Sequence, residues 1–405
     1  MDARLPTRGI VIAGAVAALL LAWQIVSVGV SRYLQDIDPA AAVRLRPHNG
    51  WALSALAERT LEKGRYGAAA GLARQAIANA PFDARAFRVL AQSREMAGDT
   101  SGARRLMEHA GSLNRRDPAT AYWLYHDAMQ AGRYGDAINW ADALMRRAPN
   151  TTPLIVWELA LSADNPGLAS ALVQHLGQAP PWRPALIQAL YRGGFSEQEA
   201  LAILNGLRKT EAPATADEIT PFLLKMVRQG ELDSAYSAWR GFLSPAERGA
   251  ATSLIYDGQF RHPPGPAPFG WQLMKVDGAD AALSSSTEGA GLQVRTGGLS
   301  NSQVIRQLLL APAGRYRLAS RARLIDGEAG ELEWRVACEG APAKYLLRMD
   351  LPLSGDKAGV ATGEFTAPEG CEAQYLSLWT VGSDTPEPMT AWVDEVRLQT
   401  LRGPG

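Results

Sequence analysis

The feature that most constrains the fold is a glycine that returns every 34 residues. Alanine keeps the same interval in a phase of its own, and proline keeps it in a third phase with Arg115 where one proline would fall. A period of 34 residues is the length of a helix–turn–helix unit that stacks on copies of itself. Such a unit cannot bury its apolar face alone, so we expect a superhelical stack of helix pairs. The repeating positions are Gly64, Gly98 and Gly132; Ala69, Ala103 and Ala137; and Pro47, Pro81 and Pro149.

Each phase has a physical meaning. The glycine ends the first helix of a unit, where a left-handed backbone is wanted. The alanine lets the two helices of a unit approach closely, and the proline closes the second helix because it cannot continue one. The units run over 50–83, 84–117 and 118–151 and resemble tetratricopeptide repeats. Leu53 and Leu56 fill positions where that family usually has Trp and Leu, whereas Thr60 and Arg94 stand where Tyr is common.

The repeat pattern extends on both sides of these three units. Residues 37–47 are predicted to be the second helix of an incomplete unit. Downstream, 152–180 is shortened and broken by three prolines, and helix pairs are then predicted over 185–208, turning at Gly193–Gly194, and over 217–243, turning at Gly230. We therefore expect about six helix pairs in an all-α solenoid over 39–250. The resemblance implies a groove that holds a protein partner. Residues of the first helices are the candidates for its surface: Ser54, Glu58, Arg88, Gln92 and Tyr125.

A membrane anchor is predicted ahead of the helices. Residues 9–30 carry no charge, and at ~1.5 Å per residue they reach ~33 Å, enough to cross a hydrocarbon core of ~30 Å. A cleaved signal peptide has a shorter apolar stretch and a small-x-small cleavage site, which Val28–Ser31 matches poorly. Arg4 and Arg8 favour a cytoplasmic N-terminus over 1–8. We therefore expect a single-pass protein of the bacterial inner membrane whose later domains face the periplasm.

Two cysteines, Cys338 and Cys371, both lie in the last third of the chain. In an oxidising compartment they can pair and cross-link a β-domain. The alternative is two buried thiols. Neither has a CxxC or histidine companion, which argues against a zinc site. The net charge is zero, with 41 basic and 41 acidic residues, so nucleic acid is not an expected partner.

After about residue 252 the apolar pattern changes from a helical to an alternating period. Seven or eight short strands separated by turn residues predict an all-β antiparallel sandwich or jelly roll over 253–400. We place strands at 253–260, 302–310, 314–324, 330–338, 344–351, 359–367, 371–381 and 389–398, with the proline-rich stretch 261–270 as an internal loop.

This domain resembles the carbohydrate-binding modules of the galactose-binding-like jelly-roll class. The residues that carry the resemblance are Asp257, Gly258, Phe260 and Trp271; Gln307, Leu309, Gly314, Tyr316 and Leu318; and Asp394. It implies glycan binding by aromatic stacking, with Tyr375 and Trp379 as the preferred pair and Tyr345 and Trp271 as further candidates. Trp334 and Trp392 are expected in the core. The resemblance also implies a possible structural calcium at Asp257 and Asp394, although Arg261 stands where an acidic residue is common.

The sequence shows no catalytic motif. It has no HExxH, GxSxG or Walker loop, and its five histidines have no metal-ligand spacing. Glu331 and Glu333 alternate on one strand and are expected on a solvated face, since glycosidase pairs come from separate elements of a cleft. We therefore expect a non-catalytic scaffold in the synthesis or export of a cell-surface polysaccharide. Two alternatives stay open: a protein-only assembly factor of the cell envelope, whose sandwich aromatics are buried, and a degraded glycosidase.

Overall fold

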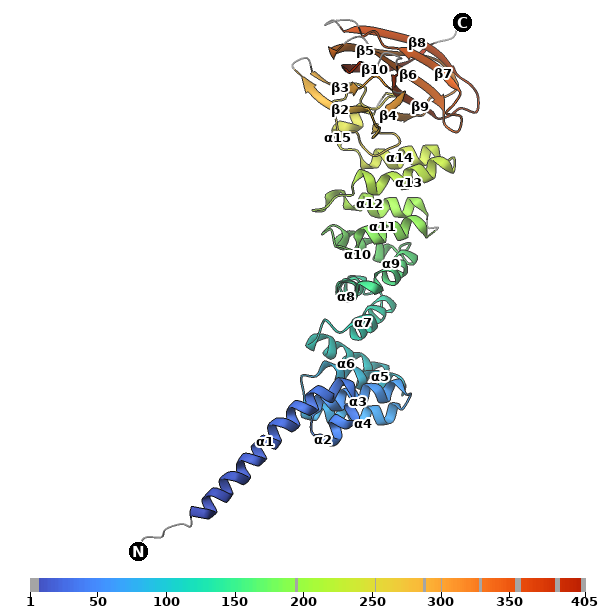
Figure 1. Ribbon diagram of the computed structural model, residues 1–405. Coiled ribbons are helices and arrows are strands. Elements are labelled where there is room, and N and C mark those ends of the chain that lie inside the picture. Colours follow the sequence, from blue (N-terminus) through green and yellow to red (C-terminus); the bar gives the residue numbers. More distant parts are fainter. Residues whose placement is uncertain are drawn as a thin grey trace. The chain divides into compact units, whose positions relative to one another are not determined.

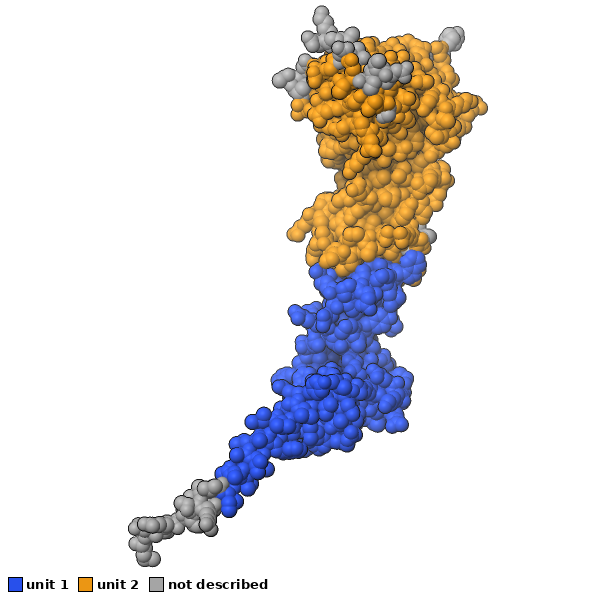
Figure 2. All heavy atoms as spheres, viewed as in Figure 1, with its two compact units in different colours: residues 1–158 blue, residues 159–405 orange. Residues whose placement is uncertain are grey.

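The structure is a computed structural model that describes residues 7–401, apart from 194–195, 252, 287–288, 300, 328–329, 354–357 and 383–386. It divides into two compact units, residues 1–158 and 159–405 (Figure 2). Most of the predicted cytoplasmic segment 1–8, and the predicted turn residue Gly194, lie outside the described residues.

The first unit is helical. A long helix, α1, leads into a short one, α2, and three helix pairs follow in chain order (Figure 1). The sequence therefore predicts the three repeat units correctly. The bounds are α1 Thr7–Ile37, α2 Pro39–Leu45, α3 Gly50–Glu62, α4 Tyr66–Asn79, α5 Ala84–Glu95, α6 Thr100–Leu113, α7 Pro118–Gln130 and α8 Tyr134–Arg147, and then a 3-10 turn over Pro149–Thr151 and helix α9, Thr152–Leu161, at the division between the units.

The repeating residues do what their phase predicts. Gly64, Gly98 and Gly132 have φ values of 71°, 85° and 69°, in the left-handed region that favours glycine. The three alanines of the second phase are completely buried, which allows close helix packing. Side chains of Asp83, Asp99 and Asp117 cap α5, α6 and α7 by accepting backbone N–H bonds, each cap contributing about 1 kcal/mol. The glycine turns and helix caps thus define the same helix pairs as the buried alanines that pack them.

In chain order α10 follows α9, which spans the division between the units, and two further helix pairs lie wholly within the second unit. Counted along the chain, these helices make six pairs within the described residues, as predicted. Gly230 again takes a positive φ, 80°, and Ala235 is completely buried, so the last pair keeps the repeat geometry. The bounds are α10 Pro166–Leu176, α11 Arg183–Arg192, α12 Glu197–Gly206, a 3-10 turn Leu207–Lys209, α13 Ala216–Arg228, α14 Leu232–Phe242 and α15 Pro245–Ala250.

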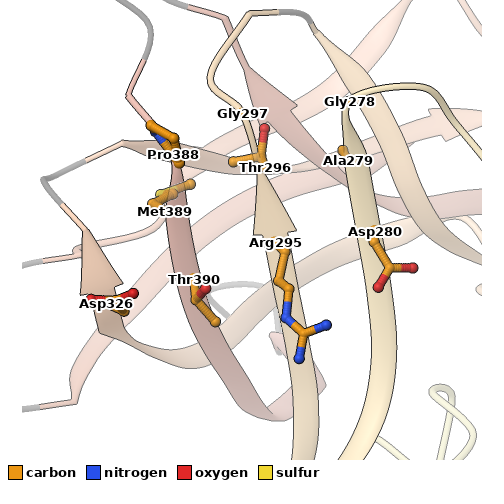
Figure 3. Close-up of a pocket in the computed structure, with 10 residues that line it drawn as sticks. All are labelled: Gly278, Ala279, Asp280, Arg295, Thr296, Gly297, Asp326, Pro388, Met389 and Thr390. Atoms are coloured by element: carbon orange, nitrogen blue, oxygen red, sulfur yellow. The ribbon is translucent and has the colours of Figure 1, made fainter.

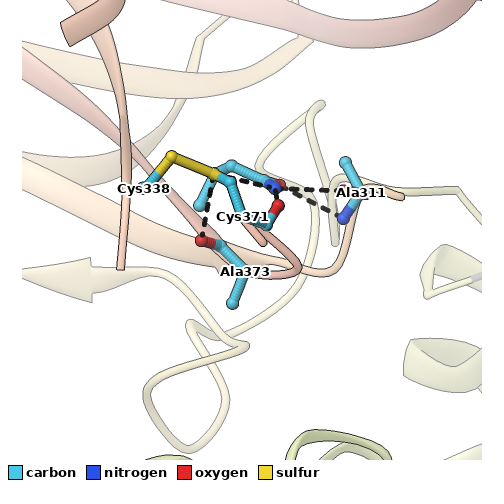
Figure 4. Close-up of a disulfide and its surroundings, with 5 residues drawn as sticks. Ala311, Cys338, Cys371 and Ala373 are labelled. Atoms are coloured by element: carbon cyan, nitrogen blue, oxygen red, sulfur yellow. Dashed lines mark hydrogen bonds between the residues drawn. A yellow bond between two sulfur atoms is a disulfide. The ribbon is translucent and has the colours of Figure 1, made fainter. Parts of the chain in front are cut away.

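Two antiparallel five-stranded sheets complete this unit as a sandwich. One has the order β1-β4-β9-β6-β7 and the other β2-β3-β10-β5-β8. The disulfide between Cys338 and Cys371 is present and ties the end of β6 to the loop before β9 (Figure 4). The strands are β1 Gln272–Leu273, β2 Ala279–Ser286, β3 Gly289–Thr296, β4 Ser302–Leu309, β5 Gly314–Gly327, β6 Glu331–Cys338, β7 Tyr345–Asp350, β8 Gly359–Ala367, β9 Gln374–Val381 and β10 Met389–Leu401.

The prediction of a strand at 253–260 is wrong. Asp257 and Phe260 have φ values of 45° and 52°, which no strand permits. The backbone N–H and C=O of Tyr256 bond to the buried side chain of Gln307, at 3.0 and 3.1 Å, in place of a strand partner. Strands β2 and β3 were not predicted, because their small and polar residues lack a clear apolar alternation.

An aromatic cluster joins the last helix pair to the sandwich. Trp239 of α14 is 1% exposed and packs against Tyr256 and Phe269, with ring centroids 5.3 and 5.7 Å apart. Tyr236, one turn earlier, also contacts Phe269, at 5.3 Å. Burial of such rings is worth several kcal/mol in total, so the last helices and the sandwich form one compact body.

Candidate functional site

The candidate site is one face of the sheet β1-β4-β9-β6-β7. Along β6 and β9, alternate residues such as Trp334, Val336, Leu376 and Leu378 are completely buried between the two sheets. The residues between them therefore point away from the other sheet. Register places five polar side chains in one row across all five strands: Gln272, Arg306, Ser377, Arg335 and Arg348. With Tyr345, Tyr375, Trp379 and Glu333 they make up what we call the arginine–aromatic face.

Arg335 is the centre of this face. Its guanidinium carbon lies 4.4 Å from the ring centroid of Trp379 and 5.2 Å from that of Tyr345, within the range of cation–π contacts. Trp379 Nε1 donates to Ser377 Oγ at 2.9 Å, and Ser377 Oγ donates to the Arg335 carbonyl at 3.3 Å. Both aromatic side chains are half-buried, so their orientation is fixed while part of each ring meets solvent.

Glu333 holds two arginines in place. Its carboxylate accepts from Arg335 Nε at 2.8 Å and from Arg348 Nε and an η nitrogen at 2.6 and 2.7 Å. The Arg348 hydrogen bond, followed by that of Arg335, lowers the pKa of Glu333. Only 2% of Glu333 is exposed, so its predicted place on a solvated face is wrong, whereas Glu331 is exposed as expected.

Tyr375 and Arg306 occupy the other end of the face. The Arg306 guanidinium lies 4.8 Å from the Tyr375 ring centroid, and its Nε donates to Gln272 Oε1 at 2.7 Å. Burial raises the pKa of Tyr375, so its hydroxyl is protonated at neutral pH. Among the described residues no carboxylate lies within ion-pair distance of Arg306. This end therefore offers a cation and a phenol hydroxyl to a ligand.

Three of the four predicted glycan-contacting aromatics thus come together, but Trp271 does not. It is 2% exposed, packs 5.2 Å from Phe260 and 5.9 Å from Trp334, and donates from Nε1 to the Asp257 carbonyl at 3.2 Å. A core indole cannot stack on a sugar, so this assignment is corrected. Trp334 is in the core as predicted, and Trp392 is buried where it lies over Gly291.

The contacts of Asp257 and Asp394 do not support the predicted calcium. The Asp257 carboxylate accepts from the backbone N–H groups of Arg261 and His262 at 3.0 and 2.7 Å, closing a local turn. Asp394 Oδ1 lies 4.0 Å from Arg321 Nε. In the part of the chain that the structure describes, no group of three or more His, Cys, Asp or Glu side chains could hold a metal ion.

The predicted groove residues of the solenoid divide into two kinds. Ser54 and Tyr125 are buried at 0% and 1% exposure, so they belong to the helix packing and their assignment to a groove is corrected. Arg88 bridges neighbouring repeats, with hydrogen bonds to Glu58 at 2.6 Å and Asp117 at 2.7 Å. Gln92 is half-buried. Sequence reasoning did not foresee this ion-pair chain, because its members are about 30 residues apart and come from two different units.

A hollow with a volume of about 460 Å³ lies on the other sheet, β2-β3-β10-β5-β8 (Figure 3). A row of polar side chains crosses four strands there, with Arg295 between Asp280 and Thr390 and with Asp326 beyond Thr390. The row holds two carboxylates, one guanidinium and one hydroxyl, and none of the described residues that line the hollow is aromatic. It therefore lacks the stacking surface of the arginine–aromatic face.

No protein-family model matches the chain, and no curated protein matches it. Among solved structures, one described as "CBM4 structure and function" is 17% identical over 36% of this chain and 99% of its own, with a TM-score of 0.29. A CBM61 module solved with beta-1,4-galactotriose is 14% identical over 36% and 92%, at 0.24. The tetratricopeptide repeat protein YrrB, described as having an unusual peptide-binding site, is 11% identical over 51% and 90%, at 0.29. The chain's own helix pairs and its two five-stranded sheets agree with the all-α solenoid and the antiparallel sandwich that the sequence predicts.

Proposed function

We propose that this protein is a membrane-anchored, non-catalytic scaffold that faces the periplasm, holds a protein through its helical repeats and binds glycan through its sandwich. The role fits the synthesis or export of a cell-surface polysaccharide. The observation that carries the glycan part is the arginine–aromatic face, where Trp379 and Tyr345 flank a fixed guanidinium. Aromatic rings stack on the C–H faces of sugars. The exposed guanidinium of Arg348 can donate to hydroxyl or carboxylate oxygens, whereas the buried guanidinium of Arg335 holds the two rings in place.

The anchor is supported by α1. Its stretch Ile12–Ile37 is the one helix in the described residues that is long and apolar enough to cross a membrane, and a signal sequence would pass the same test. The contacts of Arg46 favour an uncleaved helix. Arg46 bonds to Gln24 and Ser27, and cleavage near residue 30 would remove both of these partners. Asn49 bonds to Ser31 and Arg59 to the carbonyls of the last turn, on residues that such a cleavage would leave in place.

The periplasmic side is supported by the disulfide, since such bonds persist in oxidising compartments. For the protein partner, α7 offers an exposed aromatic site. Tyr122 is 40% exposed and stacks edge-on against His126 at 4.4 Å, and His126 Nε2 lies 3.7 Å from Glu158 Oε2. A peptide with an apolar side chain and a basic group would match this pairing of ring and carboxylate.

The test is binding of the detergent-purified full chain to an array of bacterial surface glycans. We expect saturable binding that Trp379→Ala abolishes and that Trp157→Ala, which removes an exposed tryptophan of the repeats, leaves unchanged. A folded protein that binds no glycan would refute the glycan role. The protein-only assembly factor, which predicts buried aromatics such as Trp271, would then be the better account.

A further inference from the structure

The first helices of the solenoid pack against the C-terminal part of the predicted membrane helix. Ser31 of α1 is completely buried, donates to the Ala42 carbonyl at 3.2 Å and accepts from Asn49 Nδ2 at 2.8 Å. Closer to the N-terminus of α1, Arg46 donates to Ser27 Oγ at 3.3 Å and to Gln24 Oε1 at 2.8 Å. The first helices of the solenoid therefore lie against α1 from Gln24 upward.

The length of α1 below this contact is too short to cross a bilayer. Between Arg8 and Gln24 lie about 15 uncharged residues, of which those from Ile12 onward are described and are exposed. At ~1.5 Å per residue this stretch spans ~23 Å. A hydrocarbon core is ~30 Å thick, and a tilted helix needs still more residues. About five further residues, Gln24 to Val28, must therefore enter the membrane, and the loop bonded to them comes down to the headgroups.

That loop, residues 44–51 between and flanking α2 and α3, has the chemistry of a membrane surface. Arg44 is exposed and Arg46 half-buried, and among the described residues neither has a carboxylate within ion-pair distance. Arg32 of α1 is also exposed, and it too has no carboxylate within ion-pair distance among the described residues. Trp51, at the start of α3, is 49% exposed, and tryptophan is favoured at membrane–water interfaces. Guanidinium groups at that depth find their natural counter-ion in lipid phosphate, which they bind bidentately.

We propose that Arg44 and Arg46 form a binding site for the phosphate of an anionic phospholipid, which seats the first helix pair on the bilayer. The site rests on the membrane anchoring proposed above. Arg46 is held by Gln24 and Ser27 through one η nitrogen, so its remaining N–H groups are available to a phosphate. The bound lipid would fix the height at which the repeats leave the membrane.

The test uses the full chain in nanodiscs of phosphatidylcholine containing or lacking phosphatidylglycerol, with retained lipids counted by native mass spectrometry. We expect the wild type to retain phosphatidylglycerol several-fold over phosphatidylcholine. The double variant Arg44→Gln/Arg46→Gln should lose that preference. Arg105→Gln, which removes an exposed arginine of α6, should keep it.

Two further measurements separate the possible failures. Gln24→Ala/Ser27→Ala removes the intramolecular partners of Arg46 but keeps both cations, so it should keep the lipid preference, and loss there would overturn the assignment of the site to the two arginines. Extraction by alkaline carbonate tests the anchor itself. A chain that stays in the membrane without preferring the anionic lipid overturns the site alone, whereas a chain that carbonate releases overturns the anchoring as well.

Discussion

Glu333 gives the sharpest test of the arginine–aromatic face. The change Glu333→Gln keeps the shape of the side chain but removes its charge. The side chains of Glu333 and Arg335 are 3% and 9% exposed, so the variant leaves a buried guanidinium without its counter-ion. Breaking a buried pair in this way costs ~3–5 kcal/mol. The glutamine oxygen still accepts one hydrogen bond, so we expect the lower end, about 3 kcal/mol.

The assay is thermal unfolding of the full chain in detergent, followed by near-ultraviolet circular dichroism. For a body of this size each kcal/mol shifts the midpoint by roughly 2–4 °C, so a loss of roughly 6–12 °C is expected. The matched control is Glu364→Gln. Glu364 also binds two arginines, Arg315 and Arg317, but on an exposed strand surface, so its loss should leave the midpoint unchanged within error.

The pH dependence supplies an independent check. Hydrogen bonds from Arg348 and Arg335 lower the pKa of Glu333 below its ordinary value of 4.5. A lowered carboxyl pKa stabilises the fold above the unfolded-state pKa, and this stability is lost as the pH falls through the folded-state pKa. The midpoint difference between wild type and Glu333→Gln should therefore be constant from pH 6 to 8 and shrink below about pH 4.5. Equal effects of Glu333→Gln and Glu364→Gln would refute the reasoning.

Two further changes probe the sandwich by the same assay. Cys338→Ser/Cys371→Ser opens a loop of 33 residues and should cost about 4 kcal/mol by loop entropy; reduction of the wild type should give the same shift, and a smaller one would show that the unfolded chain is already compact. Gly291→Ala places a Cβ against the Trp392 ring, closer than van der Waals contact allows, and should cost ~1–3 kcal/mol, whereas Gly67→Ala, with open space around it, should not destabilise.

The sequence predicts the repeats well because several signals coincide at each position. Gly64 needs a left-handed backbone, Ala69 needs a close helix contact, and both recur with one period. The strand at 253–260 failed for the opposite reason. Its apolar alternation is real, but Asp257 and Phe260 take positive φ values, and Gln307, some fifty residues away, satisfies the backbone of Tyr256.

The site was only partly predictable. Alternation along β9 places Tyr375 and Trp379 on one face, and this needs no knowledge of the fold. Arg335, the centre of the face, was missed because the sheet order β1-β4-β9-β6-β7 is not the chain order. Its partners Trp379 and Arg348 come from other strands, and no local pattern reports that pairing. Trp271 was misassigned because the pattern cannot distinguish a core indole from a surface one.

The sandwich is better regarded as the end of the helical stack than as a separate module. Trp239 brings α14 against Tyr256 and Phe269, and Leu308, beside Tyr375 in the register, helps to line a cavity of about 540 Å³ at the same junction. The charge of Arg228, at the end of α13, is close enough to act on Tyr375. One end of the arginine–aromatic face is thus set by the helices. The last helix pair therefore packs beside the Tyr375 end of this face, within the second unit.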